Sequence, residues 1–295
     1  MSSILSIPLP VLSGQLVIGL INGSFYALLG VGLAIIFGML RIVHFAQGAF
    51  FMMGAFAAWM LLGYLNVNYW LALLLAPLIV AVIGMGLERT LIRRLYGLDH
   101  MYSLLITFAL AMIIESLFRN FFGSAGIPYA IPPSLRGGQN LGFMFLPYYR
   151  LWVIVAAVAC CAATWMIIEK TSLGALLRAA TEDAKLVQSF GVNVPRMIML
   201  TYAAGVALAA FAGVLAAPMY SVYASMGSNI IINVFAIVVI GGMGSLLGAI
   251  AGGFVLGVAE ALTKLLYPQA SATVIFVVMI VVLLYRSKSP SSQAS

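Results

Sequence analysis

Eight long apolar stretches dominate this sequence and restrict its fold more than any other feature. A helix needs about 20 mostly apolar residues to cross the hydrocarbon core of a bilayer. The candidate stretches are residues 11–40, 48–65, 69–87, 101–119, 151–168, 198–217, 230–266 and 271–285. Only 7% of the 295 residues are charged, whereas soluble domains carry about 25%. We therefore expect an all-α polytopic membrane protein, folded as a single transmembrane domain over residues 1–295.

Two of these stretches are too long for a single crossing. A helix of about 30 residues measures about 45 Å, whereas the hydrocarbon core is about 30 Å thick. Residues 230–266 contain the run Gly-Gly-Met-Gly-Ser at 241–245. We expect a break there between two shorter helices, either as full crossings or as a re-entrant pair. Residues 11–48 are expected to break near Gly38 or within 41–48. The expected number of transmembrane helices is about eight to ten.

The broken segment at 241–245 also bears on function. Irregular backbone at membrane depth is tolerated only where protein buries it or a water-filled path hydrates it. Transporters often place broken helices beside the route of their substrate. We therefore expect Gly241, Gly242, Gly244 and Ser245 to lie close to a translocation path.

The basic residues predict the orientation of the chain. Residues 88–100, 169–196 and the tail from Arg286 hold nine of the fourteen Lys and Arg residues. Because cytoplasmic loops are enriched in these residues, we expect all three regions and the C-terminus in the cytoplasm. The loop 169–197 is then internal and the loop 119–150 external. The first ten residues lack a basic segment, so the first span is expected to be retained, and its orientation stays open.

A few polar residues interrupt the apolar segments. Asn22 and Tyr26 are four residues apart and share a helix face, and His44 and Gln47 lie between the first two spans. Polar side chains in spans usually bond to neighbouring helices, which makes a structural role the default. They can equally line a polar path, and both interpretations remain open for these four residues.

The remaining reactive residues favour structural roles. Glu115 and Arg119, like Glu260 and Lys264, have the four-residue spacing of a local ion pair near a span end. An ion-coupled carrier would instead require carboxylates or cation ligands at mid-membrane. A membrane enzyme would require a cluster of His, Asp or Glu, which the two distant histidines do not provide. The adjacent Cys160 and Cys161 are interpreted as small buried hydrophobes, without a metal site.

The longest internal loop has the features of a short helix. Helix-forming residues fill 174–190, Gly191 is a plausible stop, and Pro195 follows. This helix is either a passive interfacial element or a docking element for a cytoplasmic partner. The chain contains no Gly-x-x-x-x-Gly-Lys-Ser/Thr loop for binding a nucleotide. If transport uses ATP, the ATPase must be a separate chain.

Three motifs together resemble one family, the membrane-embedded permeases of branched-chain amino acid ABC importers. Residues 22–28 resemble its Asn-Gly-x-x-Tyr-Ala-Leu motif, and residues 241–260 resemble its Gly-Gly-Met/Ile-Gly-Ser signature with a closing Glu. Residues 178–193 resemble its ATPase-coupling segment. One motif differs, because the family commonly has Asn-Phe/Met-Ala-His-Gly where this chain has His44-Phe45-Ala46-Gln47-Gly48. We expect this difference to affect the choice of substrate more than the fold.

The resemblance implies a non-enzymatic permease subunit in a bacterial inner membrane, moving branched-chain or related small amino acids. It implies a sister permease or second copy, two cytoplasmic ATPases that carry ATP and Mg, and a periplasmic binding protein. No cofactor, metal or nucleic acid is expected on this chain. Relatives carrying urea or short amides look similar, and an ion- or proton-coupled carrier of small solutes is the alternative. The ATPase-coupling residues implied by the resemblance are Gly174, Arg178, Ala179, Glu182, Asp183 and Gly191.

Overall fold

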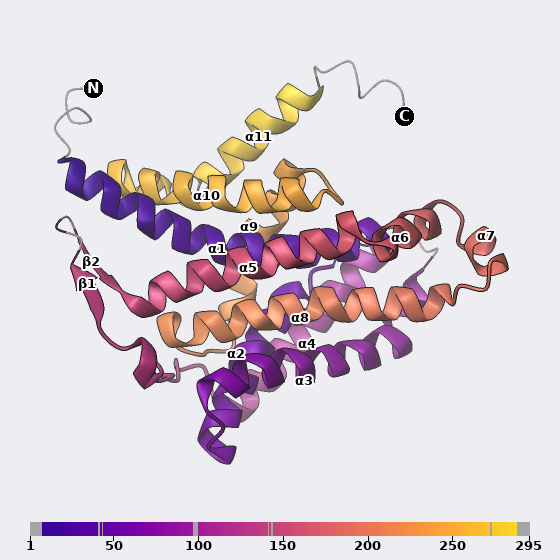
Figure 1. Ribbon diagram of the computed structural model, residues 1–295, viewed down its shortest axis with the longest axis horizontal. Coiled ribbons are helices and arrows are strands. Elements are labelled where there is room, and N and C mark those ends of the chain that lie inside the picture. The colour runs from indigo at the N-terminus through magenta and orange to yellow at the C-terminus, as the bar shows by residue number, and fades with distance from the viewer. Residues whose placement is uncertain are drawn as a thin grey trace.

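The computed structural model describes residues 8–40, 42, 44–96, 100–140, 142, 144–271 and 273–287. Within these ranges the chain forms helices and the loops that join them, together with one two-stranded hairpin (Figure 1). The α-helices are α1 (Leu9–Leu40), α2 (Gln47–Leu65), α3 (Tyr69–Thr90), α4 (His100–Phe122), α5 (Tyr148–Lys170), α6 (Ser172–Glu182), α7 (Ala184–Ser189), α8 (Val194–Tyr220), α9 (Met226–Gly241), α10 (Leu246–Leu266) and α11 (Val274–Ser287). Short 3-10 turns occupy Ile92–Leu95, Pro133–Leu135 and Pro268–Ala270. Strands β1 (Gly138–Asn140) and β2 (Phe145–Pro147) pair in antiparallel register.

The expected all-α polytopic membrane fold is confirmed. Seven helices in the described residues are long and apolar enough to cross a membrane, and two shorter apolar helices cover Met226–Gly241 and Val274–Tyr285. Together they are consistent with the expected eight to ten crossings. Arg41, in the expected break at 41–48, lies outside the described residues, and so does the tail from Lys288 onward, which the orientation argument used.

The first apolar stretch forms one long helix. α1 runs without interruption through Gly38 and ends at Leu40, and α2 begins at Gln47. The expected break is therefore confirmed within 41–46, and the alternative break at Gly38 is wrong. With 32 residues, α1 is about 48 Å long at 1.5 Å per residue. It must tilt or extend beyond a hydrocarbon core of about 30 Å.

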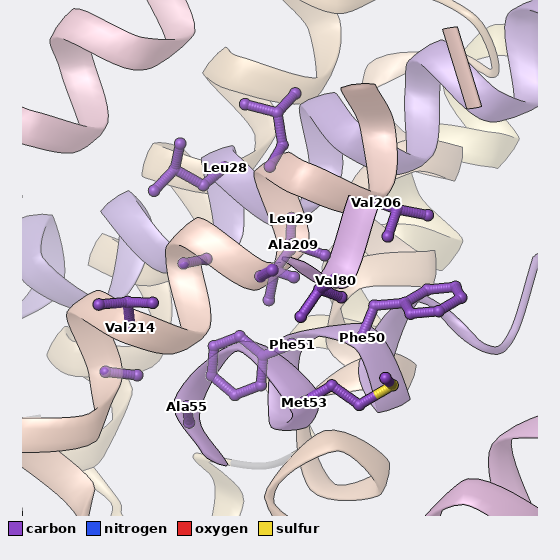
Figure 2. Packing of buried hydrophobic residues seen from close by; sticks show 14 of the residues in the cluster. Leu28, Leu29, Phe50, Phe51, Met53, Ala55, Val80, Val206, Ala209 and Val214 are labelled. Carbon is purple, nitrogen blue, oxygen red and sulfur yellow. The ribbon is translucent and has the colours of Figure 1, made fainter. Parts of the chain in front are cut away.

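The core forms where α1, α2, α3 and α8 meet. In Figure 1, α1 lies between α10 on one side and α8 on the other, and α2 and α3 pack on the far side of α8. Figure 2 shows the buried side chains at this junction: Leu28 and Leu29 of α1, Phe50, Phe51, Met53 and Ala55 of α2, Val80 of α3, and Val206, Ala209 and Val214 of α8.

Small residues allow these helices to pack closely. A Cβ atom added to Gly257 of α10 would lie 2.4 Å from the backbone nitrogen of Gly23 in α1. A Cβ atom at Gly213 of α8 would lie 1.9 Å from the carbonyl oxygen of Phe51 in α2. Lipid gives helices no hydrophobic drive to associate, so close backbone contact of this kind supplies much of the packing energy.

The break between α9 and α10 is confirmed, and we call residues 242–245 the glycine turn. α9 ends at Gly241, and α10 begins at Leu246. Gly242 and Gly244 have φ angles of 95° and 87°, a backbone region that favours glycine. The hydroxyl of Ser245 accepts a hydrogen bond from the Gly248 amide at 3.1 Å and caps α10. The turn therefore reverses the chain, and α9 packs back on α10.

The bundle has two distinct ends. At the end that we call the hairpin end, β1 and β2 lie beside the start of α1, where Gly14 faces the side chain of Met144. At the other end, which we call the α6 end, α6 and α7 extend beyond the long helices (Figure 1). The glycine turn lies at the α6 end, because Gly244 approaches Gly38 of α1 and lines a small hollow with Gly174 of α6.

Candidate functional site

A partly polar cavity opens in the half of the bundle nearer the hairpin end, and we call it the polar hollow. It has a volume of about 270 Å³ and lies among α1, α2, α9, α10 and the end of α8. Its polar lining is Asn22, Tyr26, Tyr220, Tyr223, Asn229, Asn233, Glu260 and Lys264, and its apolar lining is Phe25, Phe51, Met226 and Ile230. An ionisable group within a membrane span indicates a functional site by default. The polar hollow is therefore the candidate site.

Tyr26 organises one side of the polar hollow. Its side chain is buried, and its hydroxyl donates a 2.6 Å hydrogen bond to Oε2 of Glu260. The same hydroxyl accepts a 2.9 Å hydrogen bond from Nδ2 of Asn233. α1, α9 and α10 each supply one residue of this hydrogen-bonded series. A hydrogen bond to a carboxylate is stronger than one between neutral groups, so Tyr26 stabilises the charge of Glu260 inside the bundle.

This geometry corrects one prediction. Glu260 and Lys264 were expected to form a local ion pair, but no ion pair joins them in the described structure. Tyr26 reaches Glu260 from α1 and holds its carboxylate, so Lys264 stays exposed at the edge of the hollow. The corresponding prediction for Glu115 and Arg119 is confirmed, because these two side chains form an ion pair.

Asn22 and the aromatic residues form the opposite side. Oδ1 of Asn22 accepts a 3.0 Å hydrogen bond from the hydroxyl of Tyr220 at the end of α8. The rings of Tyr220 and Phe25 meet edge to face, with centroids 5.8 Å apart. Tyr223 accepts a hydrogen bond of 3.4 Å from Nδ2 of Asn229. The hollow thus combines charge, hydrogen-bonding groups and apolar surface, as ligand sites for small molecules do.

His44 and Gln47 lie apart from the polar hollow. Both are fully buried. Nε2 of His44 is 2.8 Å from the hydroxyl of Tyr202, and Nε2 of Gln47 donates a 3.0 Å hydrogen bond to the carbonyl of Gly205. In this conformation they tie the start of α2 to α8. The four polar residues singled out in the sequence therefore fall into two groups, and a role of His44 and Gln47 on a path stays a prediction.

The glycine turn belongs to a second, smaller hollow at the α6 end. This hollow has a volume of about 120 Å³ and is lined by Gly38 and Met39 of α1, Gly174, Arg178 and Thr181 of α6, and Gly244 and Leu246. Of the expected path residues, Gly244 lines this hollow, and Gly241, Gly242 and Ser245 are its neighbours in the chain. They lie toward the opposite end of the bundle from the polar hollow. Whether a substrate passes them stays a prediction.

The internal loop forms two helices instead of the single helix expected over 174–190. α6 ends at Glu182, and Asp183 adopts an extended conformation. Its carboxylate then accepts hydrogen bonds of 2.9 Å from the amides of Lys185 and Leu186 and so caps α7. The aspartate side chain competes with the continuing helix for these donors, which explains the break. Gly191, with a φ angle of 85°, follows α7 as the expected stop.

α6 is tightly attached to the bundle, whereas α7 projects from it. A Cβ atom at Gly174 would lie 1.6 Å from the carbonyl oxygen of Ile168, so α6 sits directly against α5. Arg178 reaches back to Glu169, with 3.4 Å between the charged atoms, across an exposed surface. Beyond the break, Leu186 is 55% exposed and Phe190 is 79% exposed. Large apolar side chains exposed together outside the membrane segments indicate a contact surface.

Sequence reasoning missed several residues of the polar hollow. Asn233, Tyr220 and Tyr223 were not singled out, and Glu260 was assigned to a local pair. Asn233 was the one available signal, since it is a polar residue within an apolar span. The sequence gives no sign that Asn233 contacts Tyr26, because 207 residues separate the two.

Comparison with known proteins gives a consistent result over almost the whole chain. Residues 15–283 match the family model described as "Branched-chain amino acid transport system / permease component". No solved structure matches the chain significantly.

Curated relatives agree with this match. The chain is 30% identical over 285 residues to the high-affinity branched-chain amino acid transport system permease protein BraD of Pseudomonas aeruginosa, covering 92% of this chain and 93% of that protein. It is 31% identical over 288 residues to the permease protein LivH of Salmonella typhimurium, covering 92% of both chains. It is 26% identical to LivM of the same organism over 81% of this chain and 61% of LivM. The chain therefore belongs to the family of permease components of branched-chain amino acid transport systems.

Proposed function

We propose that this protein is the permease subunit of an ABC importer that moves branched-chain amino acids across a bacterial inner membrane. Family membership is the observation that carries the proposal, since the similar BraD and LivH are permeases of branched-chain amino acid transport systems. The chain performs no chemistry of its own in this scheme. Separate ATPase subunits bind ATP and Mg and supply the energy.

The assembly contains four kinds of subunit in this proposal. The similarity to LivM, a second permease protein, supports a paralogous sister chain as the partner in the membrane. Two ATPases bind on the cytoplasmic side, and a periplasmic binding protein delivers the amino acid at the external loop 119–150. The hairpin end then faces the periplasm, and the α6 end faces the cytoplasm.

The α6–α7 segment is the proposed ATPase dock. It projects beyond the bundle (Figure 1) and carries exposed apolar side chains on and after α7. Its inner part, with Gly174 and Arg178, borders the hollow that contains the glycine turn. A movement imposed on α6 by an ATPase would therefore change the shape of a hollow that the glycine turn also lines, which couples the two segments in this proposal. Arg178, Ala179, Glu182, Asp183 and Gly191 belong to the proposed coupling region.

The docking proposal can be tested with two matched aromatic substitutions. Phe190→Ala removes the most exposed apolar side chain of the α7 region, and Phe145→Ala removes an exposed one of the hairpin. We expect Phe190→Ala to reduce ATPase co-purification and leucine uptake while membrane insertion is unchanged. Phe145→Ala should leave ATPase co-purification unchanged. Equal co-purification in both variants would exclude α7 from the dock.

The proposed substrate path starts at the polar hollow, with Asn22 and Tyr26, and passes toward the glycine turn. Asn22→Cys and Tyr26→Cys, each as a single cysteine, should react with a water-soluble thiol reagent in at least one nucleotide state. Cysteines at His44 and Gln47 should be inert in the conformation described, because both residues are fully buried. Reaction of either one in an ATP-bound state would place it on the path, whereas inertness in every state would leave it a packing role.

A further inference from the structure

We infer that the polar hollow is a binding site for a zwitterionic amino acid, with Glu260 as the partner of its ammonium group and Lys264 as the partner of its carboxylate. This inference rests on the proposed function, which names a transported amino acid but no residue that recognises it. The observation that carries it is that Glu260 and Lys264 have opposite charges and line the same cavity without forming an ion pair in the described structure.

The charges are arranged to complement a zwitterion. Glu260 and Lys264 are four residues apart on α10 and therefore share a face. Such a pair would normally bond to itself. Here Oε2 of Glu260 instead accepts a hydrogen bond from Tyr26, and in the described structure Oε1 has no hydrogen-bond partner and Lys264 has no ion pair. A molecule carrying both charges can bridge the two side chains, whereas a neutral solute leaves both without a partner.

The lining fits the rest of an amino acid. The side-chain amide of Asn233, whose Nδ2 donates to Tyr26, lies beside the proposed ammonium site as a second polar group. Phe25, Phe51, Met226 and Ile230 provide an apolar surface for an aliphatic side chain. The volume of about 270 Å³ lies just below the range of about 300 to 1,000 Å³ that pockets for drug-sized molecules have. A small aliphatic zwitterion suits a cavity of this size and composition.

The arrangement also suits a transporter rather than a tight receptor. The carboxylate of Glu260 already has one strong partner in Tyr26, and Lys264 is exposed to solvent. A bound ammonium would contact the remaining oxygen, Oε1, of a carboxylate that Tyr26 already stabilises, and a bound carboxylate would form a solvent-exposed ion pair with Lys264, which is weak. Conduction requires a site that is favourable enough to enter and weak enough to leave.

A test uses protection of a cysteine in the hollow. In the assembled transporter in vesicles, with Cys160 and Cys161 replaced by alanine, one variant carries Asn229→Cys and a second carries Ser228→Cys. These adjacent exposed residues of α9 face different cavities, and only Asn229 lines the polar hollow. The measured quantity is the rate of modification by a water-soluble thiol reagent. The added probes are leucine, 4-methylpentanoate, which lacks the ammonium, and 3-methylbutylamine, which lacks the carboxylate.

Leucine should protect Asn229→Cys about tenfold more effectively than either fragment, because each fragment lacks one of the two charge contacts; tenfold corresponds to about 1.4 kcal/mol. Ser228→Cys should not be protected. Adding Glu260→Gln should reduce protection by leucine to that of 4-methylpentanoate, and adding Lys264→Met should reduce it to that of 3-methylbutylamine. Glu115→Gln, which changes another carboxylate within a span but outside the polar hollow, is the matched control and should have no effect.

The inference is overturned if leucine protects no better than its fragments, or if Glu260→Gln leaves its advantage intact. Leucine uptake by the unsubstituted transporter in the same vesicles separates the two proposals. Uptake without protection overturns the binding site alone. Absence of uptake for every branched-chain amino acid overturns the proposed function, and protection in that case still supports the site.

Discussion

At the scale of single residues, Tyr26 is the most informative position. Its hydroxyl joins α1 to Glu260 of α10 and to Asn233 of α9. A carboxylate within a membrane span is expensive unless a neighbouring group stabilises it. The sequence identified Tyr26 as a candidate by its spacing from Asn22. It could not identify its partner Glu260, because the two are 234 residues apart and meet only when α1 packs on α10.

Tyr26→Phe should destabilise the protein by removing this hydrogen bond. Bonds to charged groups contribute about 1.5–3 kcal/mol, so the melting temperature of the purified complex should fall measurably. Tyr64→Phe is the matched control, because Tyr64 is 69% exposed and should tolerate the change. Equal melting temperatures for the two variants would mean that the bond to Glu260 adds nothing to stability.

Glycine contacts allow a second prediction at this scale. Gly257→Ala would place a Cβ atom 2.4 Å from the backbone of Gly23, whereas Gly86→Ala on α3 meets nothing within 4 Å. Overpacking costs about 1–3 kcal/mol, while alanine improves an exposed helix position by up to about 1 kcal/mol. Thermal unfolding should therefore show a less stable Gly257→Ala and an unchanged or more stable Gly86→Ala. The opposite order would contradict the close α1–α10 packing.

At the scale of elements, the sequence predicts most helices and their breaks, because apolar length is a strong signal. The glycine turn follows from Gly242 and Gly244, whose positive φ angles other residues rarely adopt. The division of the internal loop into α6 and α7 was missed, although Asp183 is a good N-cap residue. Helix-forming residues on both sides of Asp183 favoured one continuous helix. The capping role of Asp183 can be recognised only from its extended backbone in the structure.

Asp183→Ala should weaken α7 without unfolding the bundle. Loss of an N-cap costs about 1 kcal/mol of local stability. Asn68→Ala, which removes the cap of α3, is the matched control at another helix start. We expect co-purification of the ATPase subunits to fall for Asp183→Ala and to stay normal for Asn68→Ala. Normal co-purification and uptake in both variants would show that the order of α7 is unimportant for coupling.

At the scale of the whole molecule, the account depends on which end faces the cytoplasm. The distribution of basic residues predicts that the α6 end faces the cytoplasm. An impermeant thiol reagent applied to intact cells can test this orientation. In the background with both cysteines replaced, Gln139→Cys in the hairpin should be labelled and Lys185→Cys on α7 should not. Both positions are exposed in the structure. Labelling of Lys185→Cys alone would reverse the proposed orientation.

Reconstitution tests the central claim most directly. The chain would be assembled in proteoliposomes with the sister permease, ATPase and binding-protein subunits proposed above, and uptake of radiolabelled leucine would be measured. The account predicts uptake that requires internal ATP at the ATPase sites, requires the binding protein, and is abolished when this chain is omitted. Leucine uptake that proceeds without ATP and follows an imposed proton or sodium gradient would contradict it and favour an ion-coupled carrier.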